Sequence, residues 1–340
     1  MDNLNIVNLI QAGMIAIGIL GGLLCLTKPK EFRGIAALLF CIALAACINI
    51  LEESGLTREI YLISPIFIML FGPATYLAVK LLIEKRLNKS QWWHLLPTLP
   101  VLFFTSYTSI IIGIGTLWRL FYALLTVLML LRYKQSLDEE RSDSDDFSLN
   151  WLVWILAVTA VFNLLDLIRL NIQHAIPHEL NLFGQGVNNA VWLVTAMLII
   201  IKLQVQNNIP KNMHKSSTAD IDNDLLVEDY SSIFQELDQL VTSNQWFLKP
   251  RLTLSDVSHL TGLQTRDISR AINVVTNKSF NEYINNYRVD FVCSTLDEHP
   301  QKTLSDVAVD AGFSSKATFN KVFKQISGTT PSEYKSRKEV

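Results

Sequence analysis

The sequence predicts an all-α protein in which a bundle of about seven membrane-spanning helices precedes a C-terminal domain of two helix-turn-helix units. Half of the chain is hydrophobic, only 18% is charged, and apolar stretches recur as far as residue 206. The pentapeptide Thr-Leu-Ser-Asp-Val occurs at Thr253–Val257 and again at Thr303–Val307, and a glycine follows each copy at the same distance, Gly262 and Gly312. Self-similarity over a period this long indicates a duplicated supersecondary unit.

Seven apolar stretches approach the length of roughly 20 residues that an α-helix needs to cross a bilayer. They are approximately Ile6–Leu26, Gly34–Leu51, Ile60–Ile83, Trp93–Ile110, Ile112–Leu131, Leu149–Leu170 and Val187–Leu203. Pro97, Pro100, Gly113 and Gly115 interrupt the fourth and fifth, so these two are the least clearly bounded. Ile6–Leu26 lacks a basic lead-in and a small-residue cleavage site, which favours a span over a cleaved signal peptide. We expect residues 1–206 to form a polytopic membrane domain.

Lysine and arginine are distributed unevenly between the two sides of this bundle. If the N-terminus faces outward, three basic residues lie in outer loops or outer span ends: Arg58, Arg119 and Arg169. Nine then lie in inner loops: Lys28, Lys30, Arg33, Lys85, Arg86, Lys89, Arg132, Lys134 and Arg141. Because inner loops carry the excess of positive charge, we expect a periplasmic N-terminus. An odd number of spans then places Lys202 and everything after it in the cytoplasm.

Three segments outside the spans have their own interpretations. Residues 207–223 are polar and aperiodic, and we expect a flexible linker before a domain at residues 224–340. The acidic stretch Asp138–Asp146 is expected to be a solvated inner loop rather than a partner site. Apolar residues then recur at intervals of four and three, which predicts a helix that packs on the C-terminal domain or, alternatively, a short coiled coil. They are Leu226, Tyr230, Ile233, Leu237 and Leu240.

Each copy of the repeat is predicted to be a helix, a glycine turn and a second helix. In the second copy Ser305 is the expected N-cap of the first helix, and Gly312 can end that helix at positive φ without steric cost. Ser314 and Ser315 can cap the next helix. Its apolar residues share one face, and Gly328 ends it.

The first copy follows the same plan, with Asn277 at the position of the terminating glycine. Asparagine is the side chain that best tolerates the left-handed conformation required there. A capping box follows each copy, Ser279–Glu282 and Thr330–Glu333. The expected bounds are about 252–277 for the first helix-turn-helix, 280–298 for a linker helix and about 303–328 for the second helix-turn-helix.

Leu252–Arg288 and Thr303–Arg337, with GFSSKATFNKVFKQISGTTPSEY in the second, resemble the AraC/XylS family of bacterial transcription regulators. The resemblance covers roughly residues 224 to 340, about a third of the chain. It implies that two recognition helices enter successive major grooves on one face of DNA and that a long helix joins them. Two positions depart from the family's pattern: Asn277 replaces the usual glycine, and Ala317 lies where many relatives carry a polar side chain.

The same resemblance implies which side chains contact DNA. Near the start of each recognition helix, the expected base contacts are Arg266, Ser269, Arg270, Lys316, Ala317, Asn320 and Lys321. Arginine and lysine suit guanine, asparagine suits adenine, and Ala317 is expected to contact a thymine methyl or nothing. Asn273, Lys278 and Lys324 are the expected phosphate contacts. The alternative is that these residues are merely solvated polar faces. From Trp246 onward 13 basic residues face 10 acidic ones, so non-specific affinity should be modest and salt-sensitive.

Polar residues inside the spans raise the question of a sensor. Asn163, Asp166 and Arg169 recur at intervals of three in the sixth span, while Arg119, Asn188 and Asn189 are expected at a similar depth. Ionisable residues in a span are costly and usually face the bundle interior or a watery cavity. They form either a structural pair that orients helices or a ligand site. Two arginines against one aspartate favour an anionic or carboxylate-bearing small molecule, with a peptide, a lipid or a membrane protein as other possible signals.

The function that these patterns favour is a membrane-embedded, one-component transcription regulator, located in a bacterial inner membrane with its DNA-binding domain in the cytoplasm. The partners expected are promoter DNA, RNA polymerase, the bilayer, an unknown signal and a possible second copy of the chain. The alternatives are a transporter or membrane enzyme with an appended regulatory domain, and a passive membrane anchor. We expect no enzyme activity, no cofactor and no metal, because the chain lacks H-E-x-x-H, G-x-S-x-G and phosphate-loop patterns. No cysteine pair has ligand spacing, and His174 and His178, although four apart, lie in an expected outer loop that contains Pro177.

Overall fold

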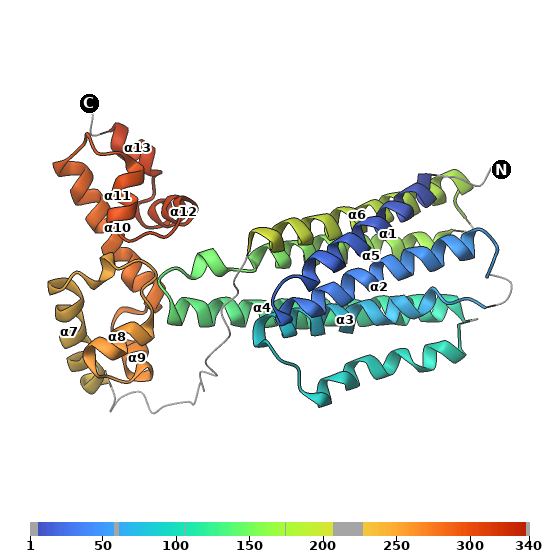
Figure 1. Cartoon of the computed structure of the whole chain (residues 1–340), viewed down its shortest axis with the longest axis horizontal. Coiled ribbons are helices and arrows are strands. Elements are labelled where there is room, and N and C mark those ends of the chain that lie inside the picture. The colour runs from blue at the N-terminus through green and yellow to red at the C-terminus, as the bar shows by residue number, and fades with distance from the viewer. Residues whose placement is uncertain (1–5, 58–60, 106, 174, 207–226, 338–340) are drawn as a thin grey trace. The chain divides into compact units, whose positions relative to one another are not determined.

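The computed structural model describes residues 6–57, 61–105, 107–173, 175–206 and 227–337, and these are almost entirely helical (Figure 1). The all-α prediction is confirmed. The chain divides into two compact units. The described residues up to Arg132, together with Leu149–Gln206, form the N-terminal unit, and Tyr133–Ser148 together with the described residues from Val227 onward form the C-terminal unit. The expected linker at residues 207–223 lies outside the described residues.

The N-terminal unit is a bundle of long apolar helices. Among the described residues, six helices are long and apolar enough to cross a bilayer, with a short 3-10 turn at Lys30–Phe32 before the second. They are α1 (Ile6–Leu26), α2 (Arg33–Glu53), α3 (Pro65–Glu84), α4 (Thr108–Glu140), α5 (Asn150–Ile172) and α6 (His178–Val205). Large apolar side chains on their outer surfaces are exposed, including Leu20, Leu117, Trp154 and Ile201. Such an exterior suits lipid rather than water.

The expected α-helical span at Trp93–Ile110 is the part of the bundle that the prediction got wrong. The chain there forms 3-10 helices at Lys89–Thr98 and Pro100–Phe103, and α4 begins only at Thr108. Pro97 and Pro100 lack the N–H groups that an α-helix needs in its interior. At about 2.0 Å per residue, residues 89–103 still extend over roughly 30 Å, which is about the thickness of a bilayer core. Figure 1 shows α3 and α4 running in the same direction along the bundle, so this segment returns along its length between them.

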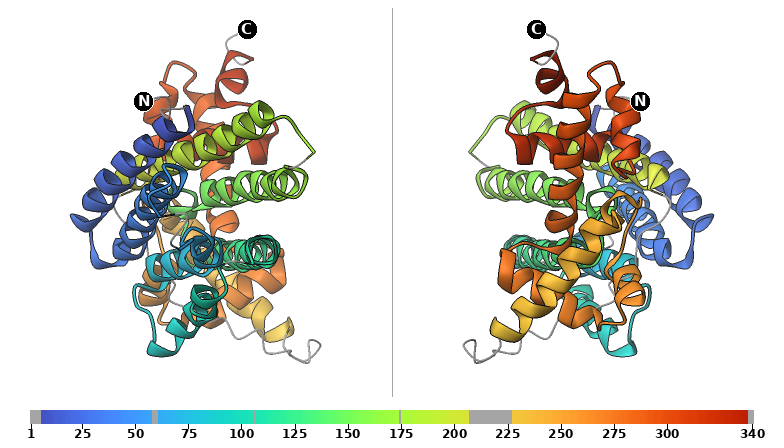
Figure 2. Two further views of the ribbon diagram at one scale, coloured as in Figure 1. Left: turned by 90° about the vertical axis from the view of Figure 1, so that its right-hand side faces the viewer. Right: turned by 90° about the vertical axis from the view of Figure 1, so that its left-hand side faces the viewer.

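The helices of the bundle surround a common interior. The end-on views show α1 beside α2 and α6, in agreement with the dense packing between these helices (Figure 2). Close approach requires glycine at one point, since a Cβ on Gly18 would lie 2.7 Å from the Leu39 carbonyl oxygen. At one end of the bundle the Lys28 ammonium donates to the Leu203 carbonyl, and Lys85 pairs with Glu31 at 3.3 Å. The C-terminal ends of α1, α3 and α6 therefore have basic partners at the same end as the basic loops.

The C-terminal unit contains two helix-turn-helix units joined by one long helix. Its elements are α7 (Val227–Ser243), a 3-10 turn at Trp246–Leu248, α8 (Leu254–Thr261), α9 (Thr265–Thr276), α10 (Phe280–Glu298), α11 (Leu304–Asp310), α12 (Lys316–Ser327) and α13 (Pro331–Ser336). Gly262 (φ +76°) ends α8, Asn277 (φ 53°) ends α9 and Gly328 (φ +77°) ends α12, as their residue types predicted. Both capping boxes are formed. The expected N-cap Ser305 is wrong, because Thr303 accepts the hydrogen bond from the Asp306 N–H.

Each helix-turn-helix has its own hydrophobic core. Ile268 and Ile272 of α9 are buried with Val257 of α8, and Phe319 and Phe323 of α12 are buried with Val307 of α11. Helix α10 contributes residues to both clusters, so this linker helix fixes the two helix-turn-helix units relative to each other. Val275, near the end of α9, is 41% exposed and lies outside this core.

Helix α7 packs on the first helix-turn-helix rather than standing apart as a coiled coil. Its Leu237 and Val241 are 1% exposed in the same core as Ile268. Tyr283 of α10 donates to the Asp238 carboxylate at 2.8 Å. The four-and-three spacing of apolar residues therefore belongs to a helix that packs on the C-terminal domain and not to a coiled coil. Leu226 lies outside the described residues.

Candidate nucleic-acid interface and bundle cavity

The first recognition helix, α9, presents a polar face that is partly exposed and that α7 contacts at Arg270. Arg266 and Asn273 are exposed on it, while Ser269 and Arg270 are half-buried. Arg270 reaches the Tyr230 hydroxyl of α7 at 3.4 Å, which orients the guanidinium. No side chain caps the Gln264 end of the helix by a hydrogen bond among the described residues. The backbone N–H groups at this end are thus available to a phosphate.

The second recognition helix, α12, carries the predicted residues on an exposed face. Lys316, Ala317, Asn320 and Lys321 are all exposed near its start, and Lys324 is exposed one turn later. Phe319 and Val322 lie on the opposite, buried face. The helix therefore divides cleanly into an inner apolar side and an outer polar side, the arrangement that major-groove reading requires.

The start of α12 is occupied by another part of the chain. The connection between α4 and α5, residues 141–149, lies on it, and we call this segment the α4–α5 loop. The Asp146 carboxylate accepts from the Ser314 hydroxyl at 2.6 Å, from the Ser315 hydroxyl at 2.8 Å and from the Thr318 hydroxyl. The Asp145 carboxylate accepts from the Lys321 ammonium at 2.7 Å. A predicted base-contacting lysine thus already has an anionic partner within the chain.

The expectation of a solvated acidic loop is therefore wrong for its last part. Ser142, Asp143 and Ser144 are at most 1% exposed. Burial raises the pKa of the Asp145 carboxyl, but the hydrogen bond from Lys321 and the charge of Lys134 outweigh it, so that pKa lies below its ordinary value. Asp145 is consequently ionised at neutral pH. The charge composition of this segment alone suggested solvent exposure. Its alternating serines and aspartates, whose hydroxyls can donate and whose carboxylates can accept hydrogen bonds, were the signal that sequence reasoning missed.

A buried arginine of the linker helix anchors the loop. Arg288 is 1% exposed and donates to the Phe247 carbonyl at 2.7 Å, the Lys249 carbonyl at 2.9 Å and the Ser142 hydroxyl at 3.1 Å. Burial lowers its pKa to about 10 while Asp143 raises it, so it stays protonated at neutral pH. Asn281 donates to the Ser142 carbonyl at 2.8 Å, and the Ser142 N–H donates to the Leu252 carbonyl at 3.0 Å. The loop is bound to the segment that precedes α8, to α10 and to α12 at once.

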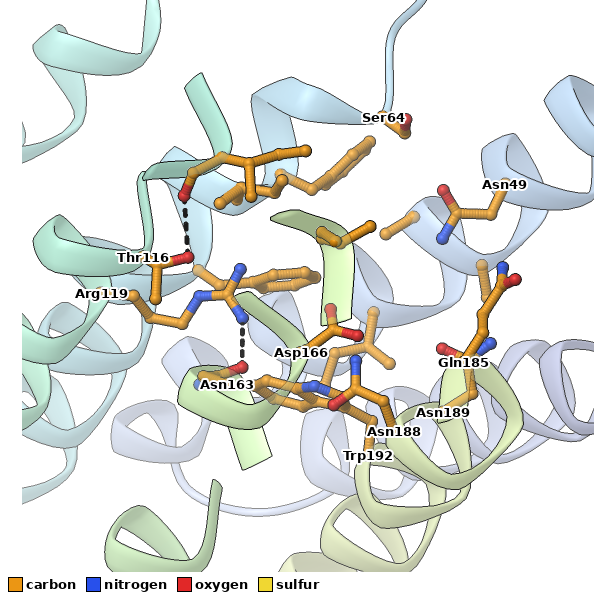
Figure 3. Close-up of a pocket in the computed structure, with 18 of the residues that line it drawn as sticks. Asn49, Ser64, Thr116, Arg119, Asn163, Asp166, Gln185, Asn188, Asn189 and Trp192 are labelled. Atoms are coloured by element: carbon orange, nitrogen blue, oxygen red, sulfur yellow. Dashed lines mark hydrogen bonds between the residues drawn. The ribbon is translucent and has the colours of Figure 1, made fainter. Parts of the chain in front are cut away.

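In the N-terminal unit, the six polar residues predicted for a sensor line one cavity. Its volume is about 390 Å³, and Arg119, Asn163, Asp166, Arg169, Asn188 and Asn189 all belong to its wall. Figure 3 shows Arg119 of α4, Asn163 and Asp166 of α5 and Asn188 of α6 facing the same space. Helical spacing predicted the face, and the fold brings the three helices together around it.

Asp166 and Arg169 form an ion pair, whereas Arg119 forms none among the described residues. Arg169 pairs with Asp166 at 2.8 Å and also donates to Asn181. Arg119 forms no ion pair among the described residues; its Nη1 donates to the Asn163 side chain at 2.6 Å. The Arg119 guanidinium lies 5.8 Å from the Trp192 ring, close enough for a cation–π contact.

Several polar atoms at the cavity have no partner among the described residues. They are Nε of Arg119, the side-chain oxygen of Asn188 and the side-chain nitrogen of Asn189, all of them buried. A buried polar group without a hydrogen bond is costly. Because two donors and one acceptor remain unused on neighbouring helices, the cavity has the hydrogen-bonding capacity of a binding site.

The charge expected of this site needs correction. Glu52 and Glu53 of α2 also line the cavity, so three carboxylates face two arginines and the wall is not net positive. Glu52 accepts from the Ile63 and Ser64 N–H groups at 2.6 and 2.9 Å, and Glu53 accepts from Gln185 at 2.6 Å. Both lie at the very end of an apolar helix, where a carboxylate is usually solvated, so no pattern in the sequence indicated that they line the cavity.

Comparison with known proteins concerns only the C-terminal unit. Residues 257–337 match a family model described as a helix-turn-helix domain. An uncharacterised HTH-type transcriptional regulator of Staphylococcus aureus is 29% identical over 84 residues, which are 25% of this chain but only 11% of that protein. The regulatory protein SoxS of Salmonella typhimurium is 29% identical over 86 residues, 25% of this chain and 79% of SoxS. No solved structure matches the chain.

Proposed function

We propose that this chain, whose residues 257–337 form an AraC-type helix-turn-helix domain, is a membrane-embedded transcription regulator controlled by a signal bound in its membrane domain. The observation that carries the proposal is the joining of two intact recognition helices to six helices long and apolar enough to cross a bilayer. The domain is that of a DNA-binding transcription regulator. Control of this domain by a signal bound in the membrane domain is the further step of the proposal.

The two recognition helices read successive major grooves, as the two similar units on one linker helix would allow. Arg266, Arg270 and Lys321 suit guanine, and Asn320 suits adenine. Lys316, Ser269 and the Ala317 methyl complete the base-facing set. Asn273, Lys278 and Lys324 lie further along and suit phosphates, which fix position without reading sequence. RNA polymerase and a second copy of the chain are the protein partners that promoter binding would bring.

The membrane topology follows from seven crossings, six by α-helix and one by the 3-10 segment at Lys89–Phe103. An odd number puts the two ends of the domain on opposite sides. Because the basic loops gather at the end where α1, α3 and α6 finish, that end is cytoplasmic, and the C-terminal unit can reach DNA.

Single cysteines test this topology. In a cysteine-free version of the full chain, cysteine would replace Glu179 or Lys89, and an impermeant thiol reagent would be added to cells with a permeabilised outer membrane. Labelling is expected at position 179 and not at 89, with both labelled after lysis as the control. Labelling of both positions or of neither in intact cells would mean that the 3-10 segment does not cross, and the reverse pattern would mean that the orientation of the whole bundle is inverted.

The cavity is the proposed signal site, because a passive anchor has no use for an arginine that forms no ion pair within the described part of an apolar bundle. A ligand with a carboxylate or carbonyl oxygen suits Arg119 Nε and the Asn189 amide, and a ligand N–H or O–H suits the Asn188 oxygen. Trp192 and Phe71 supply apolar walls. Because Arg119 forms no ion pair among the described residues, an anionic group remains the best-fitting ligand chemistry even though the wall as a whole is not net positive.

Substitutions in the cavity test the signal site. Arg119→Ala and Asp166→Asn are expected to change promoter output at normal abundance in the membrane, since a ligand acts only by binding two arrangements unequally. Arg132→Ala, an exposed arginine outside the cavity wall, is the matched control. Reporter activity and membrane immunoblots would be measured together. Unchanged output in both cavity variants would leave these residues with a packing role only.

A further inference from the structure

The α4–α5 loop occupies the groups with which α12 would bind DNA. Lys321, a proposed base contact, is paired with Asp145 at 2.7 Å. The hydroxyls of Ser314, Ser315 and Thr318, at the positive end of the helix dipole, all donate to Asp146. A helix N-terminus with several donors is a usual site for a phosphate. Two adjacent carboxylates thus take the places of a base edge and a phosphate.

Loop and DNA cannot share these groups. Lys321 cannot keep its ion pair at 2.7 Å and also bind a guanine, because the ammonium would carry Asp145 with it into the groove. The loop and the last turn of α4 also carry Asp138, Glu139, Glu140 and Asp143, which repel the phosphates of an approaching duplex. Helix α9 has no such cover among the described residues.

We propose that the α4–α5 loop is an intramolecular competitor of DNA, docked on the second recognition helix when the regulator is off and displaced from it when the promoter is bound. The loop continues directly into α4 and α5. These are the two helices that the Arg119–Asn163 hydrogen bond joins at the cavity. A change in how α4 and α5 pack there would reach the loop along α4, whose length from Arg119 to Glu140 is about 32 Å at 1.5 Å per residue.

The way the loop is attached would allow its release from α12 without its release from α10. Ser142 and Asp143, bound by Arg288 and Asn281, form a buried attachment. Asp145 and Asp146, three residues further on, accept the hydrogen bonds from the start of α12 and are half-buried. Rotation beyond Asp143 would free α12 while the attachment to α10 stays intact.

The test uses the full chain in lipid nanodiscs and rests on the proposed function, since it requires operator DNA. The variant D145N/D146N keeps the shape of the loop but loses both charges. It is expected to bind operator more tightly than the wild type, on the order of five-fold, the upper range for exposed ion pairs. The matched control E139Q/E140Q removes the same number of charges from the last turn of α4 and leaves Asp145 and Asp146 in place, and it is expected to change affinity by less.

Equal gains in the variant and in its control would overturn the proposal, since general repulsion would then explain both, and so would unchanged affinity in the variant. Absence of operator binding by every form, the wild type included, would instead refute the proposed function.

A second measurement needs no substitution. Hydrogen–deuterium exchange of the wild-type chain would follow the loop peptide, where the Asp146 and Ser148 N–H groups are bonded to the Asp143 and Asp145 carbonyls. Operator DNA is expected to speed exchange in the loop while slowing it in α12. Loop exchange that stays unchanged while α12 becomes protected would show DNA and loop bound together, and would contradict the proposal.

Discussion

The two helix-turn-helix units share one sequence plan but differ in what lies over their recognition helices. The start of α9 is free of any side-chain cap within the described chain, and α7 packs behind it. The start of α12 is capped by Ser315 and covered by Asp145 and Asp146 from the α4–α5 loop. Duplication therefore produced two similar readers, and only the second is bound to a segment that continues into apolar helices. Under the proposal, the first unit keeps its contact with DNA at all times and the second is the one that the loop controls.

The glycine turns show the same asymmetry in packing, and substituting them should have the largest effect. A Cβ on Gly312 would lie 2.4 Å from the Leu248 carbonyl oxygen, whereas nothing lies within 4 Å of a Cβ on Gly262. Both have positive φ, which costs a side chain about 1–2 kcal/mol. Overpacking adds about 1–3 kcal/mol at Gly312 only. We expect Gly312→Ala to destabilise the C-terminal unit by about 2–5 kcal/mol and Gly262→Ala by about 1–2 kcal/mol.

Pulse proteolysis of the C-terminal unit within the full chain, over a urea series, would measure both glycine variants. Equal midpoints would show that the two turns are equivalent and that the junction between Leu248 and Gly312 is loose.

Substitution of the proposed base contacts should have an intermediate effect that also differs between the units. Arg270→Ala is expected to weaken operator binding by about 1–3 kcal/mol, the value of a good base contact. Lys321→Ala is expected to weaken it by less in the full chain, because the same change releases Asp145. Tyr230→Phe, which removes the hydroxyl that orients the Arg270 guanidinium, is expected to weaken binding by less than Arg270→Ala. Binding to operator and to scrambled DNA would be measured for each variant. If Arg270→Ala leaves the discrimination between operator and scrambled DNA unchanged, the placement of the first recognition helix is wrong.

Local patterns predicted the C-terminal unit closely. The terminal glycines, Asn277 and both capping boxes specify backbone positions within a few residues, so the sequence alone located these helix ends. Ser305 failed as a cap because Thr303 precedes it with an equivalent side chain and the chain took the earlier start. The six cavity residues were found because helical spacing puts intramembrane polar groups on one face.

Features that depend on distant segments were missed. Apolar composition between Trp93 and Ile110 indicated a span but not its 3-10 geometry, which follows from two prolines packed beside α3. Glu52 and Glu53 became cavity residues only because α2 lies against α1 and α6. The docking of Asp145 and Asp146 joins residues about 170 positions from α12, and no pattern within either segment states that pairing.

The central claim, that loop and DNA compete for the second recognition helix, is tested most directly by a double-mutant cycle between Asp145 and Lys321. Operator affinity would be measured for the full-length wild type, Asp145→Asn, Lys321→Ala and the double variant in nanodiscs. Competition predicts that Lys321→Ala reduces affinity more in the Asp145→Asn background than in the wild type, by about two- to five-fold. Additive effects, with the same loss in both backgrounds, would contradict the claim.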